Sequence, residues 1–482
     1  MAGTCTAGTS KSCDDGIACT ADSCDATAGC SSAIKPWGTT CATASAAQKY
    51  PFCAGTLCTG VEEDAGALNA NMTTGILTSV DRYPNLSINT SGYDQGFGGG
   101  GGGGGQSAGL LRTVVESPLG LSANSAQNNT EYTDMRRRLT VGGNIIGGDT
   151  TPSTLVLNTA AGTWAAGGPT LIGLSRALRA VDMATDATGN EIYLFGGNAS
   201  AATGGGPGGG GTPAMAQLET ATFNGATWTA GKPLLISNST TACANAALSV
   251  TDIYAAASNL FYITAYSQAA AVGGGQNVTG VAVWNGNATA ACGGITNLGG
   301  VAYTATSADP AAFQTAINAP TFILRAIHGT SASHMLAGGD SGTLTAFDNG
   351  VWTAQAPTAP LSAPSAWGTN YAVRSVYLAG SDGWVAGTVD IPGTTTCRSM
   401  FVMHGTFGTS WTWDKIVATT ADVTTCSNTA GTRARTALNK VWVDSVTGSV
   451  YLVGSTGTDN NGNLLSTGAT QTREAVLRVK MK

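Results

Sequence analysis

The chain has 482 residues, of which only 10% are charged, and it carries a net charge of −6 with a pI near 5.1. This length fits two to four ordinary domains or one repeat array. The scarcity of Lys and Arg argues against nucleic acid as a partner, because phosphate binding needs a basic surface. No apolar run reaches the ~18–20 residues of a transmembrane helix, so we expect no membrane span.

Residues 1–60 form a predicted disulfide-rich module. Eight of the twelve cysteines lie in this segment, which has few large apolar residues, so disulfides would replace a hydrophobic core. Zinc is the rival interpretation, but the segment has no paired C-x-x-C knuckles and no histidine. We therefore predict disulfides and an oxidising compartment. The eight are Cys5, Cys13, Cys19, Cys24, Cys30, Cys41, Cys53 and Cys58.

Four more cysteines are scattered along the rest of the chain: Cys243, Cys292, Cys397 and Cys426. We expect the eight N-terminal cysteines to be bridged among themselves and these four likewise. Cys243–Cys292 and Cys397–Cys426 are favoured, because each pair is less than one sequence repeat apart. Eight cysteines allow about 105 connectivities, so the sequence leaves the N-terminal pattern open.

The centre of the module, from Cys13 to Asp25, resembles the C-x-D-G-x-x-C-T-x-D-x-C repeats of bacterial secreted and surface proteins. The resemblance implies an extracellular or cell-surface location. Its Asp and Gly residues are expected to form turns, with calcium binding as the alternative. Met1 to Thr4 have neither a basic nor an apolar signal region, so we expect the numbering to begin on a processed or recombinant chain.

Residues 61–110 are predicted to be a linker. Gly98 to Gly105 are eight consecutive glycines, and the backbone entropy of such a run is too high for it to nucleate a core. A phosphate-binding loop is not supported, because no Gly-Lys-Ser/Thr follows and no βαβ pattern surrounds the run.

From residue 111 to 482 the sequence repeats. Each unit has a short apolar strand that ends in Gly-Gly or a relative of it, then an alternating strand, a turn and in most units a tryptophan. Such short strands cannot bury both faces of a sheet alone, but radial stacking buries them against neighbouring sheets. The glycines would let blades approach and the tryptophans would fill the space between them. The turn glycines Gly162, Gly225, Gly286, Gly350 and Gly408 are 63, 61, 64 and 58 residues apart.

This order of features resembles the kelch repeat, most closely from Leu155 to Gly197. Pro169, Arg176 and the closing segment 193–197 fall where kelch units have theirs. The resemblance implies an all-β fold, a β-propeller of six to seven kelch-like blades, with residues 65–140 as the candidate for the seventh. The repeat is longer than the roughly 50 residues of kelch. An array of β-sandwiches is the structural alternative.

Four insertions follow the Gly-Gly strands: Ala199–Pro213, Ser267–Asn277, Thr388–Thr396 and Ser455–Thr472. Equivalent loops of a propeller emerge on the same face. Polar, glycine-rich loops gathered on one face are where a scaffold carries contacts. Neutral drift of surface loops explains them equally well.

The sequence predicts no catalytic constellation. The histidines His328, His334 and His404 are expected in ordinary structural roles, and no G-x-S-x-G, H-E-x-x-H or Walker motif occurs. The one metal candidate is calcium at Asp459, Asn461 and Asn463, where oxygens alternate around a glycine. A plain Asn-Gly turn is the favoured alternative, and no other cofactor is expected.

These observations predict a secreted or cell-surface binding or adhesion protein without enzymatic activity. Its loop-rich face would contact a protein or glycan partner outside the cell. The alternative is a structural subunit of an extracellular filament or coat, because low charge with much Thr, Ala and Gly suits dense packing. Self-assembly would then use the N-terminal module as the joint. A secreted propeller hydrolase or oxidase is the third, least favoured hypothesis.

Overall fold

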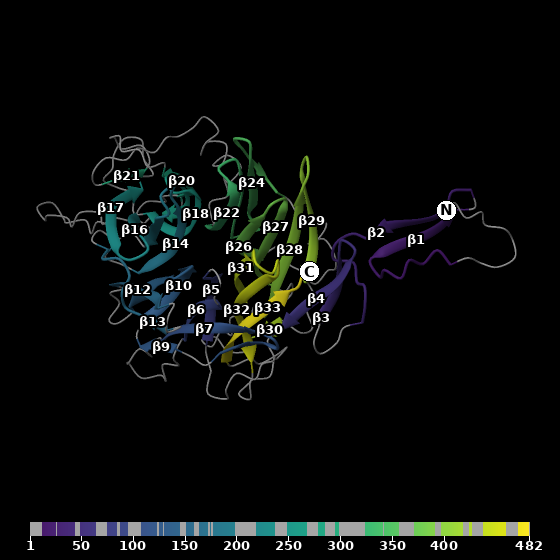
Figure 1. Ribbon diagram of the computed structural model, residues 1–482, viewed down its shortest axis with the longest axis horizontal. Coiled ribbons are helices and arrows are strands. Elements are labelled where there is room, and N and C mark those ends of the chain that lie inside the picture. Colours follow the sequence, from purple (N-terminus) through teal and green to yellow (C-terminus); the bar gives the residue numbers. More distant parts are fainter. Residues whose placement is uncertain are drawn as a thin grey trace, which may run out of the picture.

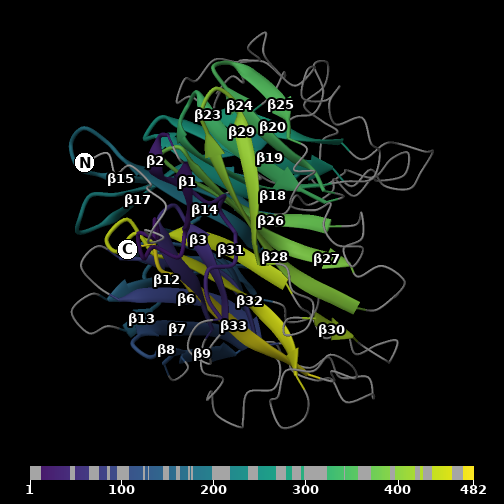
Figure 2. The ribbon, with the colours of Figure 1, turned by 90° about the vertical axis from the view of Figure 1, so that its right-hand side faces the viewer.

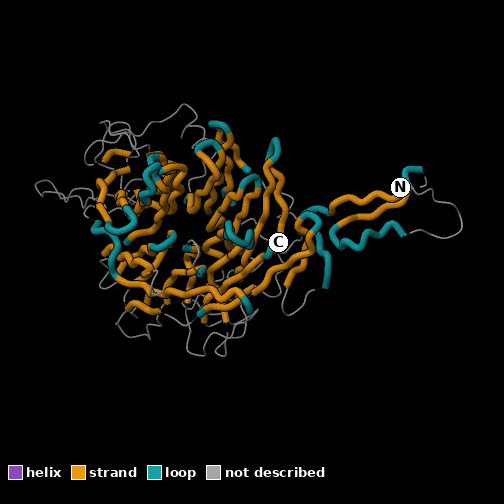
Figure 3. The backbone as a smooth tube through the Cα atoms, in the orientation of Figure 1, coloured by secondary structure: helices purple, strands orange, loops and turns teal. Residues whose placement is uncertain are grey.

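In the described part of this computed structural model, all regular secondary structure is β-strand, and Figure 3 shows strands joined by loops without a helix. The predicted all-β class is confirmed. None of the described segments forms a helix with the length and apolarity needed to cross a membrane. The structure describes residues 12–25, 27–43, 49–63, 75–83, 87–94, 108–122, 125–128, 130–144, 151–158, 163–171, 174, 177–197, 218–236, 248–267, 278–284, 295–297, 323–340, 342–355, 371–390, 397–417, 424–426, 437–458 and 471–481.

Seven sheets surround a central axis as the blades of a β-propeller (Figure 1). Blade 1 contains β5 (Gly75–Arg82), β6 (Ile88–Asp94), β7 (Ala108–Glu116), β8 (Leu119–Leu121) and β9 (Ser125–Asn128). Blade 2 contains β10 (Thr130–Arg136), β11 (Leu139–Asn144), β12 (Thr151–Asn158) and β13 (Thr163–Ala165). Blade 3 contains β14 (Leu178–Thr185), β15 (Glu191–Gly197), β16 (Leu218–Phe223), β17 (Trp228–Ile236) and β21 (Ile295–Asn297). Blade 4 contains β18 (Leu248–Ala257), β19 (Leu260–Ser267) and β20 (Val278–Trp284).

Three blades complete the ring. Blade 5 contains β22 (Leu324–Ser331), β23 (His334–Gly339), β24 (Leu344–Asp348) and β25 (Val351–Ala354). Blade 6 contains β26 (Tyr371–Ala379), β27 (Asp382–Asp390), β28 (Cys397–Phe407), β29 (Trp411–Val417) and β30 (Thr424–Cys426). Blade 7 contains β31 (Ala437–Val443), β32 (Val450–Thr458), β33 (Gln471–Val479), β4 (Leu57–Glu63) and β3 (Lys49–Ala54).

Blade 7 closes the ring with strands from both ends of the chain. Its order is β31, β32, β33, β4 and β3, and β4 pairs antiparallel with β33 so that Val61 faces Val479. The innermost strands contact one another in chain order, and the last of them, β31, contacts the first, β5. Opening the ring at blade 7 would therefore require separation of two hydrogen-bonded strands.

The domain limits differ from those that the sequence predicts. The predicted module ends at residue 60, but β3 and β4 belong to blade 7. The predicted linker 61–110 contains β5, β6 and the start of β7, so the blades begin at Gly75 rather than at 111. The run Gly98–Gly105 lies outside the described residues, between two strands of one blade. Blade 1 lacks the Gly-Gly and tryptophan marks of the other units, which is why its strands resemble a linker.

The tryptophans that end the repeats pack between blades, as predicted. Trp164 contacts a core cluster that combines Leu111 of blade 1 with Leu155 of blade 2. The equivalent tryptophans of later units each pack against a cluster shared by two adjacent blades. Burial of large aromatic surface between the sheets holds neighbouring blades together. These tryptophans are Trp228, Trp352 and Trp411.

The glycine doublets have two separate causes. A Cβ on Gly196 or Gly338, the first glycine of its doublet, would lie 2.4 or 2.3 Å from a valine methyl carbon of the next blade. A Cβ on Gly339, the second glycine, would lie 2.2 Å from the carbonyl oxygen of Ile323 in its own blade. The first position therefore permits close approach of the blades. The second permits a bend in the innermost strand.

An N-terminal arm stands outside the ring. It consists of residues 12–35 and contains β1 (Thr20–Asp25) and β2 (Gly29–Ile34), a separate two-stranded sheet that projects from the propeller (Figure 1). Figure 2 views the molecule from the side on which the arm projects, with strands of blades 6 and 7 behind it. The Cys19–Cys53 disulfide joins the arm to β3. The indole of Trp37 stacks on the His404 ring of blade 6, with 3.8 Å between the ring centroids.

Candidate functional site

The four predicted insertions occupy equivalent connections. Each joins the second strand of a blade to the third, in blades 3, 4, 6 and 7, and the glycine run joins the same strands of blade 1. Because equivalent strands of the blades run in the same direction, these connections leave the ring on one side, here called the loop-bearing face. The insertions themselves lie largely outside the described residues, and strands β27, β32 and β33 extend into their predicted ends.

All seven innermost strands carry a β-bulge in the same place. In each innermost strand one residue has no partner in the second strand of its blade. This residue lies near the end of the strand that is closest to the loop-bearing face. The bulge explains the second glycine of the doublets, because it brings a carbonyl group of the innermost strand against the second strand. The bulged residues are Thr78, Thr133, Arg179, Thr251, Arg325, Arg374 and Asn439.

Threonine or asparagine at four of the bulges ties a blade to the next one. The Thr78 hydroxyl donates to the Tyr132 carbonyl at 2.9 Å, and the Thr133 hydroxyl donates to the Leu178 carbonyl at 2.8 Å. The Thr251 hydroxyl makes the same bond to blade 5, and the Asn439 amide makes it from blade 7 to blade 1. These bonds therefore join backbone and side chain across four blade boundaries at the level of the bulges.

Arginine stands at the other three bulges, in blades 3, 5 and 6. Arg179 is exposed, and Arg325 forms a two-point ion pair with Asp340, with 2.7 Å between Nη2 and Oδ2. Arg374 is half-buried. These arginines were not predicted as site residues, although an arginine within an apolar strand in three repeats is a signal that could have revealed them. A planar guanidinium suits carboxylate and phosphate groups.

Below this level, side chains close the channel. Lys440 of blade 7 lies 3.4 Å from Asp134 Oδ1 of blade 2 and 3.7 Å from Asp252 Oδ1 of blade 4. One layer further from the loop-bearing face, Arg136 lies between Asp81 and Asp182, at 3.2 and 2.6 Å. Two cations therefore join carboxylates from four blades.

Aromatic rings fill the other half of the second layer. His328 stacks on Tyr377 with 3.9 Å between ring centroids and lies 5.3 Å from Tyr254. The His328 Nδ1 atom accepts a hydrogen bond from the Leu378 N–H, so the proton of the neutral ring is on Nε2. Burial holds the pKa of His328 well below its usual value, so the ring is neutral at pH 7.

The channel carboxylates accept hydrogen bonds from backbone N–H groups of neighbouring blades. The N–H groups of Val181, Ala255 and Ile327 donate to Asp134, Asp182 and Asp252, each across a blade boundary. Burial is the main cause that raises the pKa of Asp252 to about 6, and it also raises the pKa of Asp182. These carboxylates were not predicted as site residues. The signal was an aspartate in an otherwise apolar strand of successive repeats.

The cavity that remains on the axis is small. Its volume is about 40 Å³, and its lining includes Asp81, Asp182, Asp252, His328 and Lys440. A water molecule needs roughly 10–15 Å³ measured in this way, so the cavity has room for a few waters. This cavity is therefore too small for a sugar ring or a peptide.

The predicted histidines occupy three separate contacts. His404 is fully buried, with Nε2 3.0 Å from Asp382 Oδ1, and His334 Nδ1 pairs with Asp348. His328 lies in the channel. The predicted calcium residues Asp459, Asn461 and Asn463 lie outside the described residues.

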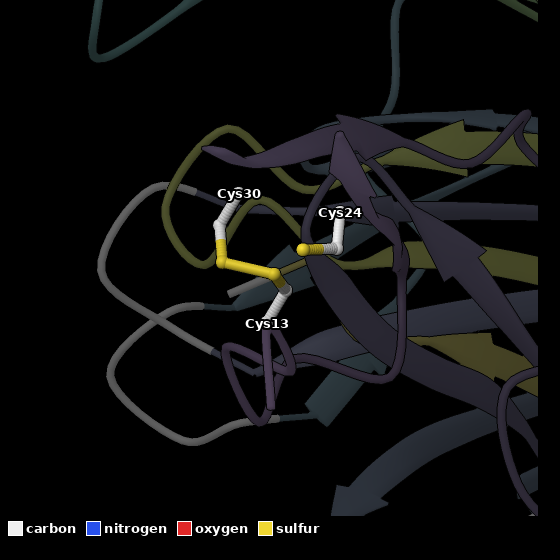
Figure 4. A group of neighbouring side chains, drawn as sticks. All are labelled: Cys13, Cys24 and Cys30. Atoms are coloured by element: carbon white, nitrogen blue, oxygen red, sulfur yellow. A yellow bond between two sulfur atoms is a disulfide. The ribbon is translucent and has the colours of Figure 1, made fainter. Parts of the chain in front are cut away.

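Disulfides link six of the eight N-terminal cysteines. They are Cys13–Cys30, Cys19–Cys53 and Cys41–Cys58. Figure 4 shows Cys24 beside the Cys13–Cys30 bridge, and Cys5 lies outside the described residues. Asp14 and Asp15 accept backbone hydrogen bonds from Gly16 and Ile17, which is the predicted turn geometry.

Of the other four cysteines, Cys397 and Cys426 lie directly opposite one another in paired strands. Cα atoms of residues so paired are about 4.5–5.5 Å apart, a separation that suits a disulfide. Cys243 and Cys292 lie outside the described residues, so the predicted bridge between them stays a prediction.

No protein-family model matches the chain, and its sequence matches no curated protein. Solved structures resemble the chain at 10% sequence identity. One is YCF48 bound to a D1 peptide, with a TM-score of 0.40 over 88% of this chain and 97% of that chain. Another is Sqt1 of Chaetomium thermophilum bound to the N-terminus of ribosomal protein L10, with a TM-score of 0.41 over 84% and 97%. A third comes from the GH130 family of mannoside phosphorylases, with a TM-score of 0.30 over 61% and 82%.

Proposed function

We propose that the protein is an extracellular, non-enzymatic binding protein that contacts a protein or glycan partner with the loop-bearing face. The observation that carries this proposal is the placement of the insertions. Four long connections and a glycine run leave one side of the ring, while the connections described on the opposite side are tight hairpins such as Asp186–Asn190. A rigid ring with variable loops on one face is an architecture suited to recognition.

The channel supports binding at the face rather than chemistry on the axis. Its cations form ion pairs with its carboxylates, and the carboxylates also accept hydrogen bonds from backbone N–H groups, so they stabilise the ring. The cavity of about 40 Å³ beside these ion pairs is too small for a sugar ring. Arginines also stand at three of the bulges, near the ends of the innermost strands that open on this face. The disulfides favour an oxidising, extracellular environment.

Loop deletion tests the proposal. Residues 199–213 are replaced by a short Gly-Ser linker, and binding is measured on intact cells and on glycan and peptide arrays. Weaker binding with an unchanged melting temperature is expected. Val446→Glu, an exposed residue in a hairpin on the opposite face, is the matched control and should bind like the wild type. Unchanged binding after deletion of all four insertions would contradict the proposal, as would turnover of any glycan on the panel.

A further inference from the structure

The N-terminal segment contains two hairpins with the same cysteine framework. The disulfides Cys13–Cys30 and Cys41–Cys58 both span 17 residues. Each hairpin also has two cysteines directly opposite one another, Cys24 with Cys30 and Cys53 with Cys58. The arm hairpin of β1 and β2 and the blade hairpin of β3 and β4 are therefore two versions of one unit.

The second unit shows how such a hairpin docks. Its later strand, β4, adds to the edge of β33, and Val61 and Glu62 face Val479 and Arg478. The Thr59 hydroxyl donates to the Lys480 carbonyl at 2.6 Å, which extends the contact. This is strand addition to the edge of a blade, in which backbone hydrogen bonds supply the affinity.

The equivalent strand of the arm, β2, has a free edge as far as the described strands go. Among the described strands, β2 pairs only with β1. Asp15 contacts both Asp22 of β1 and Ser32 of β2, so the segment that precedes the hairpin crosses its face rather than its edge. Ile34, which corresponds to Glu62 when Cys30 is aligned with Cys58, is 62% exposed. The arm projects from the ring, which directs this strand toward other molecules (Figure 1).

The edge strand of blade 5 has the matching character, unlike that of blade 4, where β20 also lacks charged residues but its described side chains are half-buried. Natural sheets protect their edges with charged residues, proline or very short strands. β3 contains Lys49 and Pro51, β29 contains Asp414 and Lys415, and β13 has only three residues. β25 contains Val-Trp-Thr-Ala, pairs only with β24, and leaves Val351 59% exposed.

We propose that strand β2 of the arm adds to the edge of β25 in a second copy of the chain. Both strands lack charged residues, and each presents a β-branched aliphatic side chain to solvent, so pairing them would bury Ile34 with Val351. The two surfaces are different, so the contact is head to tail and repeats from subunit to subunit in a ring or an open chain. It uses neither the loop-bearing face nor its insertions, and therefore goes beyond the proposed binding function.

Sedimentation at rising protein concentration tests this pairing. Strands of six and four residues form a small interface, so assembly should be weak and concentration-dependent. The wild type is expected to exceed the monomer mass of 48.0 kDa as concentration rises. Ile34→Lys and Val351→Lys should each stay at the monomer mass, because a charge on an edge strand opposes pairing. Val446→Lys, equally exposed at 66%, should assemble like the wild type.

Mixing the two blocked variants gives the sharper test. Ile34→Lys keeps a usable β25, and Val351→Lys keeps a usable arm, so the mixture should form a one-to-one dimer and nothing larger. All the substituted residues are exposed, and circular dichroism checks that each variant is folded. A wild type that stays monomeric up to about 1 mM, the weak end of specific association, overturns the proposal. Loss of assembly in Val446→Lys, or no dimer in the mixture, also overturns it.

Discussion

Lys440 of blade 7 lies across the channel from Asp252 of blade 4, with 3.7 Å between Nζ and Oδ1. The same ammonium group lies 3.4 Å from Asp134 of blade 2. One cation therefore joins three blades that are not neighbours around the ring. The side chains in the channel therefore form a polar core, whereas the cores between neighbouring blades are apolar.

Substitution of Lys440 by methionine should destabilise the propeller. The change keeps the length of the side chain but leaves Asp134 and Asp252 without their shared cation, and loss of one partner of a buried pair costs about 3–5 kcal/mol. Channel water reaches 26% of the Lys440 side chain, so we expect the lower end of that range. Denaturant unfolding measures the loss. Lys480→Met, which removes an exposed cation paired with Glu62, should cost at most about 1 kcal/mol.

Stability should fall as the pH rises from about 4 to about 6. Burial raises the pKa of Asp252 from 3.8 to about 6, so the folded protein holds this proton more tightly than the unfolded chain does. The stabilisation from the protonated carboxyl is complete below the unfolded pKa and lost as the pH passes the folded pKa. Asp252→Asn, which keeps an acceptor for the Ile327 N–H, removes this dependence. The wild-type free energy of unfolding relative to that of the variant should drop by roughly 3 kcal/mol across the window.

Equal pH slopes for the two proteins between pH 4 and 6 would contradict this assignment. Asp340→Asn is the control and should keep the wild-type decrease in stability between pH 4 and 6. Asp340 pairs with Arg325 at the bulge level, away from the channel cavity.

The repeat could be identified from the sequence because its recurring glycines and tryptophans are required by contacts between adjacent strands or adjacent blades. Gly196 and Gly338 are glycines because a side chain would strike the next blade, and Trp164 is a tryptophan because it fills the gap between two blades. Such requirements recur in each blade and are visible as a period. The predicted propeller with a disulfide-rich N-terminus is therefore confirmed, while the kelch resemblance stays a prediction.

The ion pairs in the channel and the strand pairing that closes the ring could not be predicted from the sequence in this way. Lys440 and Asp252 are separated by 188 residues, and nothing local to either shows that they meet. β4 looks like part of the cysteine module because its partner β33 lies at the other end of the chain. Contacts between distant segments depend on the curvature of the whole ring, which no single repeat specifies.

Gly387→Ala should destabilise blade 6. The new Cβ would lie 2.0 Å from the Ala372 carbonyl oxygen, so the bulged innermost strand must shift, and overpacking of this kind costs about 1–3 kcal/mol. Gly280→Ala in β20 meets no atom within 4 Å and should leave the melting temperature unchanged or slightly raised. Equal melting temperatures for the two variants would contradict the proposed cause of the glycine doublets.

Trp37→Ala should loosen the arm without unfolding the ring. The indole stacks on the His404 ring with 3.8 Å between centroids and meets the Trp384 ring edge to face at 6.3 Å. Its loss removes this aromatic contact between the base of the arm and blade 6. Hydrogen exchange should rise in residues 27–43 and stay unchanged in β31 and β32. Ile34→Ala, an exposed position on the arm, is the control and should alter neither region. Unchanged exchange in the arm of the Trp37 variant would contradict this role of the indole.

The cysteines give the last prediction. Non-reducing peptide mapping should recover Cys13–Cys30, Cys19–Cys53 and Cys41–Cys58, which use six of the eight N-terminal cysteines. The two that remain, Cys5 and Cys24, are expected to form the fourth bridge, and the opposed Cys397 and Cys426 a further one. Reduction should unfold the arm, which has almost no buried apolar side chains, while the propeller keeps its sheets. Loss of one bridge from so small a module costs about 2–5 kcal/mol, more than its core could replace. Unmodified thiols among residues 5–58, or bound zinc, would contradict both this pairing and the extracellular location inferred from it.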